Sequence, residues 1–338
     1  MKKLAIFIYT LFLIFSFCTK NKTNVENTKS NKTNKIRVIL DTDANNELDD
    51  QHAIAYMLFN GDIFDVEGIT VNRTYNGGNI EKHFEEAVRI VKLCSLNSSI
   101  KVYKGASGQY KEIITHIDEQ NYDGSDAVNF IIERAHAQDK RKLLLLGIGK
   151  LTNIALALYK DPTILEKVRV VWLGSNYPDP GEYNLENDTS AVNPLLEANV
   201  DFEMVMVRYG KPTGTDAVVA YLDDFQQLMP GKGPHISIPV TGRHGGLFTN
   251  FGDYSVNLFE NFPGHPSSRP LFDMAAVAVV KNPDWASRVV INAPKFKGGQ
   301  WIVQPNNPRK IVIWENFDKE NIMQDFYNTM GNYVLAKP

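Results

Sequence analysis

From residue 36 onward, short aliphatic runs alternate with longer stretches of helical periodicity, and this alternation restricts the fold more than any other feature. The aliphatic runs are rich in Val, Ile and Leu, with little regular alternation of polar and apolar residues. They are Arg37–Leu40, Val66–Val71, Lys101–Tyr103, Leu143–Ile148, Val168–Leu173 and Glu203–Val207. Runs of this kind are typical of strands buried on both faces, as in a parallel sheet covered by helices.

The stretches between these runs have the apolar spacing of helices. They are Leu48–Phe59, Ile80–Leu96, Asp126–Ala137, Thr152–Tyr159 and Ser190–Ala198. Strands and helices that alternate at this spacing form βαβ units. We therefore expect an α/β fold over residues 36–338, with a single doubly wound, mostly parallel sheet flanked by helices. Residues Gly231–Arg269, rich in Gly, Pro, His and aromatic residues, are expected to form long loops rather than a domain boundary.

The N-terminal part of the chain has the pattern of a targeting segment. Two lysines precede the apolar run Leu4–Phe17, which is too short for a membrane span and predicts a signal peptide over residues 1–18. The run ends at Cys18, as in bacterial lipoprotein signals, although Phe17 departs from the small residue expected there. We expect export to the periplasm or cell envelope with a lipid anchor at Cys18. Residues 19–35, rich in Asn, Thr and Lys, predict a flexible tether.

Charge and cysteine content exclude two classes of protein. The net charge is −3 and no basic stripe is present, which argues against a nucleic-acid partner. One of the two cysteines, Cys18, falls in the leader, so no intramolecular disulfide framework is expected. The other, Cys94, falls in a helical pattern and is expected to be a buried thiol.

Four aspartates crowd the first loop that follows a predicted strand. Asp41, Asp43, Asp49 and Asp50 lie in the stretch "LDTDANNELDDQ", and ligands of open parallel sheets bind beyond the carboxyl ends of strands. Carboxylates this close repel one another unless a positive charge holds them. Helix capping explains one of them, for example Asp49, but not four. Oxygen ligands without local His or Cys suit Ca²⁺ or Mg²⁺ rather than zinc. A cation site is therefore predicted, with a capping or solvated loop as the alternative.

Two later segments carry further polar candidates. The loop "GSNYPDPGEYNLEND", Gly174–Asp188, groups amides and carboxylates that can hydrogen-bond the vicinal hydroxyls of a sugar. A polar turn explains the same composition. In "RPLFDMAAVAVV", Asp273 stands at the head of an apolar run, where a lone aspartate is most often an N-cap. It gains a functional meaning only if it faces the first loop.

Taken together, these segments resemble the nucleoside hydrolase family, which cleaves N-ribosyl bonds with a bound Ca²⁺. The matching features are Asp41-Thr-Asp43, Asp49-Asp50, the segment "GKLTNIALAL" from Gly149, the series Asn176, Glu182, Asn184 and Asp188, and Asp273 before an apolar helix. The resemblance covers most of the chain after Ile36. It implies a nucleoside hydrolase-like domain over residues 36–338, a small-molecule riboside substrate and a homo-oligomer.

The resemblance also implies a role for each matching residue. The Ca²⁺ ligands would be Asp43, Asp50, Asp273 and the main-chain carbonyl of Ile148. The residues binding ribose hydroxyls would be Asp49, Asn76, Asn176, Glu182 and Asn184. Asn76 matches less cleanly than the others, because "VNRTYNGG" does not align well with the family pattern. Asp43 would also be the general base for the attacking water.

Two departures from the family pattern concern the substrate and the leaving group. The insert "ANNEL" makes the first loop longer than the family's Asp-Pro-Gly version. It is similar to a divergent group, some of whose members are described only as sugar- or cellulose-binding. Asn45, Asn46 and Glu47 would either contact sugar or form the turn. The second departure is Phe272, which stands where many family members have a histidine that protonates the leaving base. A phenyl ring can stack on a base but cannot donate a proton.

The missing acid must come from another residue if turnover is retained. We expect His244, in the aromatic-rich stretch "TGRHGGLFTNFGDY", to supply it. His265, Arg243 and Tyr254 are the alternatives.

The sequence thus predicts Ca²⁺-dependent hydrolysis of the N-glycosidic bond of ribonucleosides or related ribosides, which releases base and ribose. Such a reaction passes through an oxocarbenium-like sugar, which nearby anionic side chains stabilise. The alternatives are a non-catalytic sugar- or nucleoside-binding lipoprotein and a hydrolase of a different glycoside. Phe272 favours the binding protein, whereas Asp43 favours the enzyme, since a binding protein needs no base placed on water.

Overall fold

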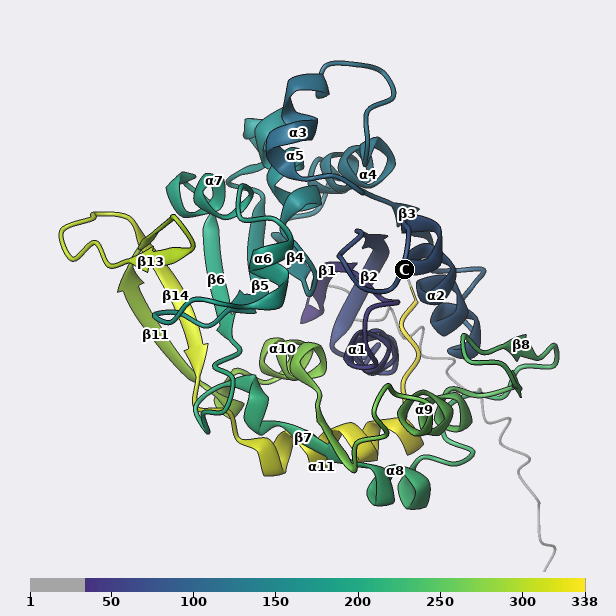
Figure 1. Cartoon of the computed structure of the whole chain (residues 1–338). Coiled ribbons are helices and arrows are strands. Elements are labelled where there is room, and N and C mark those ends of the chain that lie inside the picture. The colour runs from purple at the N-terminus through teal and green to yellow at the C-terminus, as the bar shows by residue number, and fades with distance from the viewer. Residues whose placement is uncertain (1–33, 338) are drawn as a thin grey trace, which may run out of the picture. The chain divides into compact units, whose positions relative to one another are not determined.

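A computed structural model describes residues 34–337, and its centre is an eight-stranded sheet (Figure 1). Its strands are β1 (Ile36–Thr42), β2 (Phe64–Val71), β3 (Val102–Lys104), β4 (Leu143–Gly147), β5 (Val168–Ser175), β6 (Asp201–Met206), β11 (Ser287–Asn292) and β14 (Lys310–Glu315). The order is β11-β14-β6-β5-β4-β1-β2-β3, and only β11 runs antiparallel to its neighbour in this sheet. The expected α/β fold with a mostly parallel sheet is therefore confirmed.

The order β3-β2-β1-β4-β5-β6 is that of a doubly wound fold, and its direction of winding reverses between β1 and β4. All six predicted strands are present, with bounds that differ from the prediction by at most a few residues. Strands β11 and β14, which extend the sheet beyond β6, were not predicted.

Helices cover both faces of this sheet. The predicted ones are α1 (Asp49–Leu58), α2 (Ile80–Leu93), α4 (Ser125–Ala135), α5 (Thr152–Lys160) and α7 (Val192–Glu197). The others are α3 (Tyr110–Ile113), α6 (Tyr183–Asn187), α8 (Leu222–Leu228), α9 (Phe251–Glu260), α10 (Phe272–Lys281) and α11 (Lys319–Gly331). In Figure 1, α4, α5 and α7 lie on one face, and α1 and α10 on the other with α9 and α11 beyond them.

Burial on both faces explains the unbroken aliphatic strands. Val170 and Val171 of β5 point to opposite faces, and both are fully buried. Val170 packs in the apolar cluster under α4, α5 and α7, and Val171 in the cluster under α1 and α10. Helix α1 is an extreme case, since all ten of its residues are buried. It lies between the sheet and the outer helices, so it presents no face to solvent.

The expectation of long loops over residues 231–269 was wrong in part. This region holds α9 and a two-stranded hairpin, β8 (Val240–Thr241) and β9 (Leu247–Phe248). The Asn250 side chain caps α9 by accepting a hydrogen bond from the Asp253 backbone N–H at 2.9 Å. The aromatic residues that suggested loops recur at helical spacing, and Phe251 and Tyr254 pack inward.

Other expectations concern the N-terminal segment and the cysteines. The predicted signal peptide, Cys18 and all but the last two residues of the predicted tether lie outside the described residues. In the described range, residues 34–337, no helix combines the length and the apolar character needed to cross a membrane. Cys94 is a fully buried free thiol, as expected, and burial raises its pKa well above the ordinary value.

The two-faced burial of β5 gives a direct test of the fold. We expect Val170→Ala and Val171→Ala each to lower the free energy of unfolding by about 1–3 kcal/mol, because each removes buried methyl groups and leaves a cavity. The matched control is Val290→Ala on the edge strand β11, where the side chain is 56% exposed and little change is expected. Urea denaturation measures all three. If either buried substitution costs no more than the control, the proposed packing on that face is wrong.

Candidate active site

The acidic loop lies at the reversal point of the sheet, between the carboxyl ends of β1 and β4. Asp41, at the end of β1, is buried and accepts hydrogen bonds from Thr70 and Asn153 at 2.7 Å and from Asn72 at 3.1 Å. These partners join the ends of β1 and β2 to α5. Asp41 therefore shapes the loop and leaves the other three aspartates to the pocket beyond it.

Helices α1 and α10 bring three carboxylates together. Asp49 and Asp50 open α1, and Asp273 lies in the first turn of α10, which packs against α1. Carboxylate oxygens of these three residues all lie within 4.8 Å of one another, and the side chains are buried. Asp43 lines the same pocket, and the Thr74 hydroxyl donates to its Oδ2. The Thr42 hydroxyl donates in the same way to Asp50.

These buried carboxylates have too little positive charge around them to be stable as anions. Burial, followed by repulsion from neighbouring carboxylates, raises the pKa values of Asp43 and Asp49 to about 7. The same two causes hold the pKa values of Asp50 and Asp273 well above the ordinary range. Arg269 opposes the shift at Asp49. Oxygen donors this close and this buried fit a hard divalent cation, which would supply the missing charge.

The pocket gathers eight of the residues that the sequence singled out. They are Asp43, Asp49, Asp50, Ile148, Glu182, Asn184, Phe272 and Asp273. Asn184 donates to the carbonyls of Ile148, at 3.1 Å, and Leu173, at 3.0 Å, so its oxygen remains for a ligand. Glu182 is buried and accepts from the Leu185 backbone N–H at 2.8 Å, and burial raises its pKa to about 7.

Three other predicted residues lie outside this pocket. The Asn176 side chain is bonded within its own loop, to the carbonyls of Pro180 and Gly181, and accepts from the Tyr209 backbone N–H. Asn76 and His244 line a second, larger cavity of about 810 Å³. The two cavities meet at Asn46 and Glu47 of the inserted loop, which line both.

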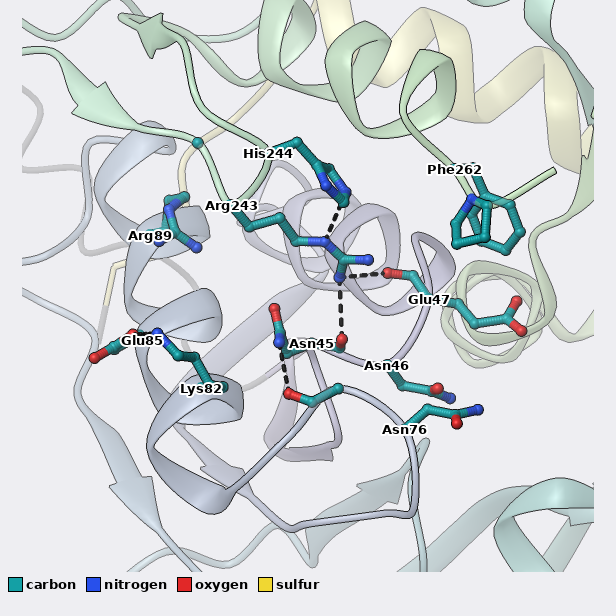
Figure 2. A pocket seen from close by; sticks show the side chains of 13 residues that line it. Asn45, Asn46, Glu47, Asn76, Lys82, Glu85, Arg89, Arg243, His244 and Phe262 are labelled. Atoms are coloured by element: carbon teal, nitrogen blue, oxygen red, sulfur yellow. Dashed lines mark hydrogen bonds and ion pairs between the residues drawn. The ribbon is translucent and has the colours of Figure 1, made fainter. Parts of the chain in front are cut away.

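The inserted loop has defined contacts (Figure 2). The Asn45 amide donates to the Gly77 carbonyl at 2.7 Å, which supports its role in the turn. Glu47 forms an ion pair with Arg269, whose guanidinium also lies 4.5 Å from the Phe262 ring centre. Asn46 has a buried oxygen with no hydrogen-bond donor in residues 34–337. Of the three, Asn46 is therefore the side chain left to meet a ligand.

His244 is held by its neighbour Arg243. The His244 Nε2 accepts a hydrogen bond from the Arg243 Nε–H at 3.0 Å, so the proton of a neutral ring sits on Nδ1. Burial, together with the charge of Arg243, lowers the pKa of His244 below its ordinary value. The ring is therefore uncharged at neutral pH.

Sequence reasoning missed several residues around the two cavities. Thr74, two positions before Asn76, is the member of its loop that contacts Asp43. Tyr209 lines the acidic pocket and packs edge-on against Phe272, with ring centres 5.8 Å apart. Tyr209 follows β6, so the rule that ligands bind beyond strand ends could have found its loop, although that loop was not predicted to line the site.

Comparison with known proteins gives a consistent result. A model of the family described as inosine-uridine preferring nucleoside hydrolase matches residues 38–324. The pyrimidine-specific ribonucleoside hydrolase RihB of Escherichia coli (strain SE11) is 26% identical over 274 residues, which cover 74% of this chain and 80% of that protein.

Solved structures of nucleoside hydrolases share the fold. The plant nucleoside hydrolase PpNRh1 superposes with a TM-score of 0.68 at 17% identity, over 87% of this chain and 98% of that one. A purine-preferring ribonucleoside hydrolase from Gardnerella vaginalis gives a TM-score of 0.65 at 22% identity, with the same coverage of both chains. At these identities the likeness shows the fold alone.

Cation binding can be measured as a gain in stability. We expect Ca²⁺ at a hundredfold excess over its Kd to stabilise the protein by about 2.7 kcal/mol, read as a rise in Tm against chelator. Asp50→Asn and Asp273→Asn should abolish the rise while making the chelated protein more stable, because one repelling charge is gone. Asp49→Asn should keep most of the rise in Tm with Ca²⁺ if Asp49 binds ribose rather than the cation. As a control, Glu203→Gln removes a distant buried carboxylate and should leave the response intact. A full Ca²⁺ response in both Asp50→Asn and Asp273→Asn would exclude this site.

The raised pKa values also predict a pH dependence of the chelated protein. Between about pH 4 and pH 7 the folded state binds more protons than the unfolded state, because Asp43 and Asp49 titrate near 7 when folded and near 3.9 when unfolded. The unfolding free energy should therefore fall as pH rises through this window. Urea unfolding at several pH values measures the slope. Asp50→Asn, with fewer repelling charges, should give a shallower slope, and an equal slope would contradict the assignment.

Proposed function

This chain belongs to the inosine-uridine preferring nucleoside hydrolase family and is an N-ribosyl hydrolase, and from this we propose that its acidic pocket cleaves the N-glycosidic bond of a riboside with a bound Ca²⁺. One observation carries the proposal. Buried carboxylates from α1, α10 and the first loop converge at the reversal point of the sheet, where doubly wound folds bind ligands.

The residues that would hold the cation are Asp43, Asp50, Asp273 and the carbonyl of Ile148. The three carboxylates that lie within 4.8 Å of one another belong to Asp49, Asp50 and Asp273, and so include Asp49 rather than Asp43. We assign Asp49 to ribose by the family resemblance. A bound divalent cation would neutralise the cluster, orient ribose hydroxyls and make a water molecule easier to deprotonate. Calcium fits the all-oxygen donor set, which contains no nitrogen or sulfur ligand.

We assign the general base to Asp43. Thr74 fixes its Oδ2, and Asp43 lines the pocket in which a metal-bound water would lie, so its carboxylate could accept the proton of that water. The missing side chain at Gly149 supports the assignment, since a Cβ there would lie only 3.0 Å from the Asp43 Oδ1. That oxygen thus has space to accept a proton from water.

The sugar would be held by carboxylates and amides of the same pocket. Glu182 and the free oxygen of Asn184 face the pocket and can accept hydrogen bonds from hydroxyls. As the bond to the leaving group breaks, positive charge develops on the ring, and the Glu182 carboxylate and the Asn184 amide oxygen would stabilise it. The hydrogen bonds of the Asn176 side chain are local, so its part would be to shape the loop that carries Glu182.

The leaving group would depart toward the larger cavity. Phe272 and Tyr209 offer aromatic faces where the bond breaks. We keep His244 as the leaving-group residue. Because its Nε2 accepts from Arg243, it would act through Nδ1–H as a neutral hydrogen-bond donor. Neutral imidazole is a weaker acid than imidazolium, so leaving groups that need little protonation should react best.

Ribose release tests this function. Protein from residue 36 onward should release ribose from inosine, uridine and 4-nitrophenyl riboside with Ca²⁺ and lose this activity with chelator. The nitrophenyl substrate needs little protonation and should react fastest. Turnover of the nitrophenyl substrate alone would mean that the general base activates water but that no residue protonates the leaving group. Binding of ribose with no release from any substrate would instead favour a non-catalytic binding protein.

The role of Asp43 has its own test. Asp43→Asn should lower kcat by about 10²–10⁴-fold, the usual contribution of a general base. Circular dichroism and thermal unfolding serve as controls for the fold. Unchanged turnover in this variant would refute the assignment of Asp43 as the base.

A further inference from the structure

The cavity beside the acidic pocket is larger and more polar than stacking on a flat base requires. Its volume of about 810 Å³ falls toward the upper end of the range for pockets that hold drug-sized ligands, about 300–1,000 Å³. Its walls come from the inserted loop, α2 and the segment before it, the β8–β9 hairpin and the segment after α9 (Figure 2). Phe262 is the aromatic residue among those that line it. A leaving group in this cavity would therefore meet mainly amides and charged side chains.

Most charges that line this cavity are already paired. Lys82 lies 3.2 Å from the Glu85 carboxylate, and Arg89 forms an ion pair with the buried Glu86. Glu47 is paired with Arg269, as described above. The remaining cation of the lining is Arg243, which forms no ion pair within 4.0 Å in the part of the chain that the structure describes. The cavity thus carries one positive charge that no carboxylate balances.

Arg243 uses two of its three nitrogens to hold protein groups. Its Nη1 donates to the carbonyls of Asn45 and Glu47 at 3.1 and 3.0 Å, and its Nε donates to His244. Its Nη2 makes no hydrogen bond to any group within residues 34–337. In Figure 2 no dashed line reaches this nitrogen, whereas the other two are joined to His244 and to the inserted loop. A half-buried guanidinium therefore offers free N–H groups to a ligand.

The hairpin that carries Arg243 is anchored, so the guanidinium is held in place. The Arg243 backbone N–H donates to the Tyr254 hydroxyl at 3.3 Å, and that hydroxyl donates to Glu86 at 2.6 Å. Arg89 reaches across to the Thr241 carbonyl at 2.6 Å. These bonds tie the hairpin to α2 and α9. A side chain fixed in this way loses little entropy when it binds a ligand.

We propose that Arg243 binds a carboxylate on the leaving group, so that this enzyme prefers ribosides whose aglycone is a carboxylated heterocycle. The free Nη2 supplies charge-assisted hydrogen bonds, which are the strongest that a carboxylate makes. Asn46, with its unpaired oxygen at the junction of the two cavities, accepts from an N–H or hydroxyl of the same ligand. The position of the ribose rests on the proposed function, whereas the anion site does not.

A matched pair of substrates tests the preference. Nicotinate riboside and nicotinamide riboside differ only in a carboxylate against a carboxamide. We expect wild-type kcat/KM to favour the carboxylate by about tenfold or more, in keeping with a hydrogen bond to a charged group. Arg243→Met should bring this ratio close to one, and Arg243→Lys should recover part of it. The ratio does not depend on how much of a variant is folded.

The control is Lys82→Met, which removes a cation of the same cavity that is already paired. It should keep the wild-type ratio. A wild-type ratio near one, or an unchanged ratio in Arg243→Met, would overturn the proposal. An equal loss in Lys82→Met would assign the preference to the general charge of the cavity and would also overturn it.

A binding measurement separates this proposal from the proposed function. By calorimetry, free nicotinate should bind wild-type protein about tenfold more tightly than nicotinamide, and Arg243→Met should remove the difference. The difference should survive chelation, whereas its loss with chelator would place the anion on the cation and refute the role of Arg243. Binding preference without any ribose release would leave the anion site standing and reject the hydrolase assignment. Release of ribose from both ribosides without any preference would support the hydrolase assignment and reject the anion site at Arg243.

Discussion

Repulsion among buried carboxylates is the constraint on which the rest of the site depends. Asp43, Asp49, Asp50 and Asp273 share one pocket, and burial makes each of them costly as an anion. The protein holds them there with packed helices, because Asp49 and Asp50 open α1 while Asp273 opens α10. Packing of the apolar parts of these helices offsets the electrostatic cost. A cation then finds its ligands already assembled, and little ordering remains when it binds.

The two cavities are built from different kinds of structure. The acidic pocket is built from strand ends and helix starts, whose positions follow from the doubly wound sheet. The larger cavity is built from the inserted loop and the β8–β9 hairpin, joined by Arg243 through backbone carbonyls of the loop. On the proposed function, sugar recognition would depend on the frame of the fold, and leaving-group recognition would depend on the inserted loop and the hairpin.

The same division explains what the sequence could predict. The strands were recognisable because burial on both faces demands aliphatic residues, as at Val170 and Val171. Most of the acidic pocket followed, since strand ends set its position. By contrast, β11 was missed because an edge strand with an exposed Val290 lacks a uniform pattern. Thr74 was missed in favour of Asn76, and the local bonds of Asn176 were not foreseen, because loop geometry follows from backbone contacts. Arg243 was named only as an alternative acid, and its contacts were not foreseen, because it binds backbone carbonyls, which every residue carries.

Helix α1 has a consequence for how such a protein can change over generations. It carries two of the aspartates, and every one of its residues is enclosed by other parts of the chain. Substitutions in α1 meet packed neighbours on all sides, so few of them are tolerated. The positions of Asp49 and Asp50 in the acidic pocket are therefore constrained by packing. The inserted loop and the hairpin are partly exposed and can accept new residues. Residues around the larger cavity can therefore change at little cost to the packing, whereas a change in α1 disturbs the acidic pocket and the fold together.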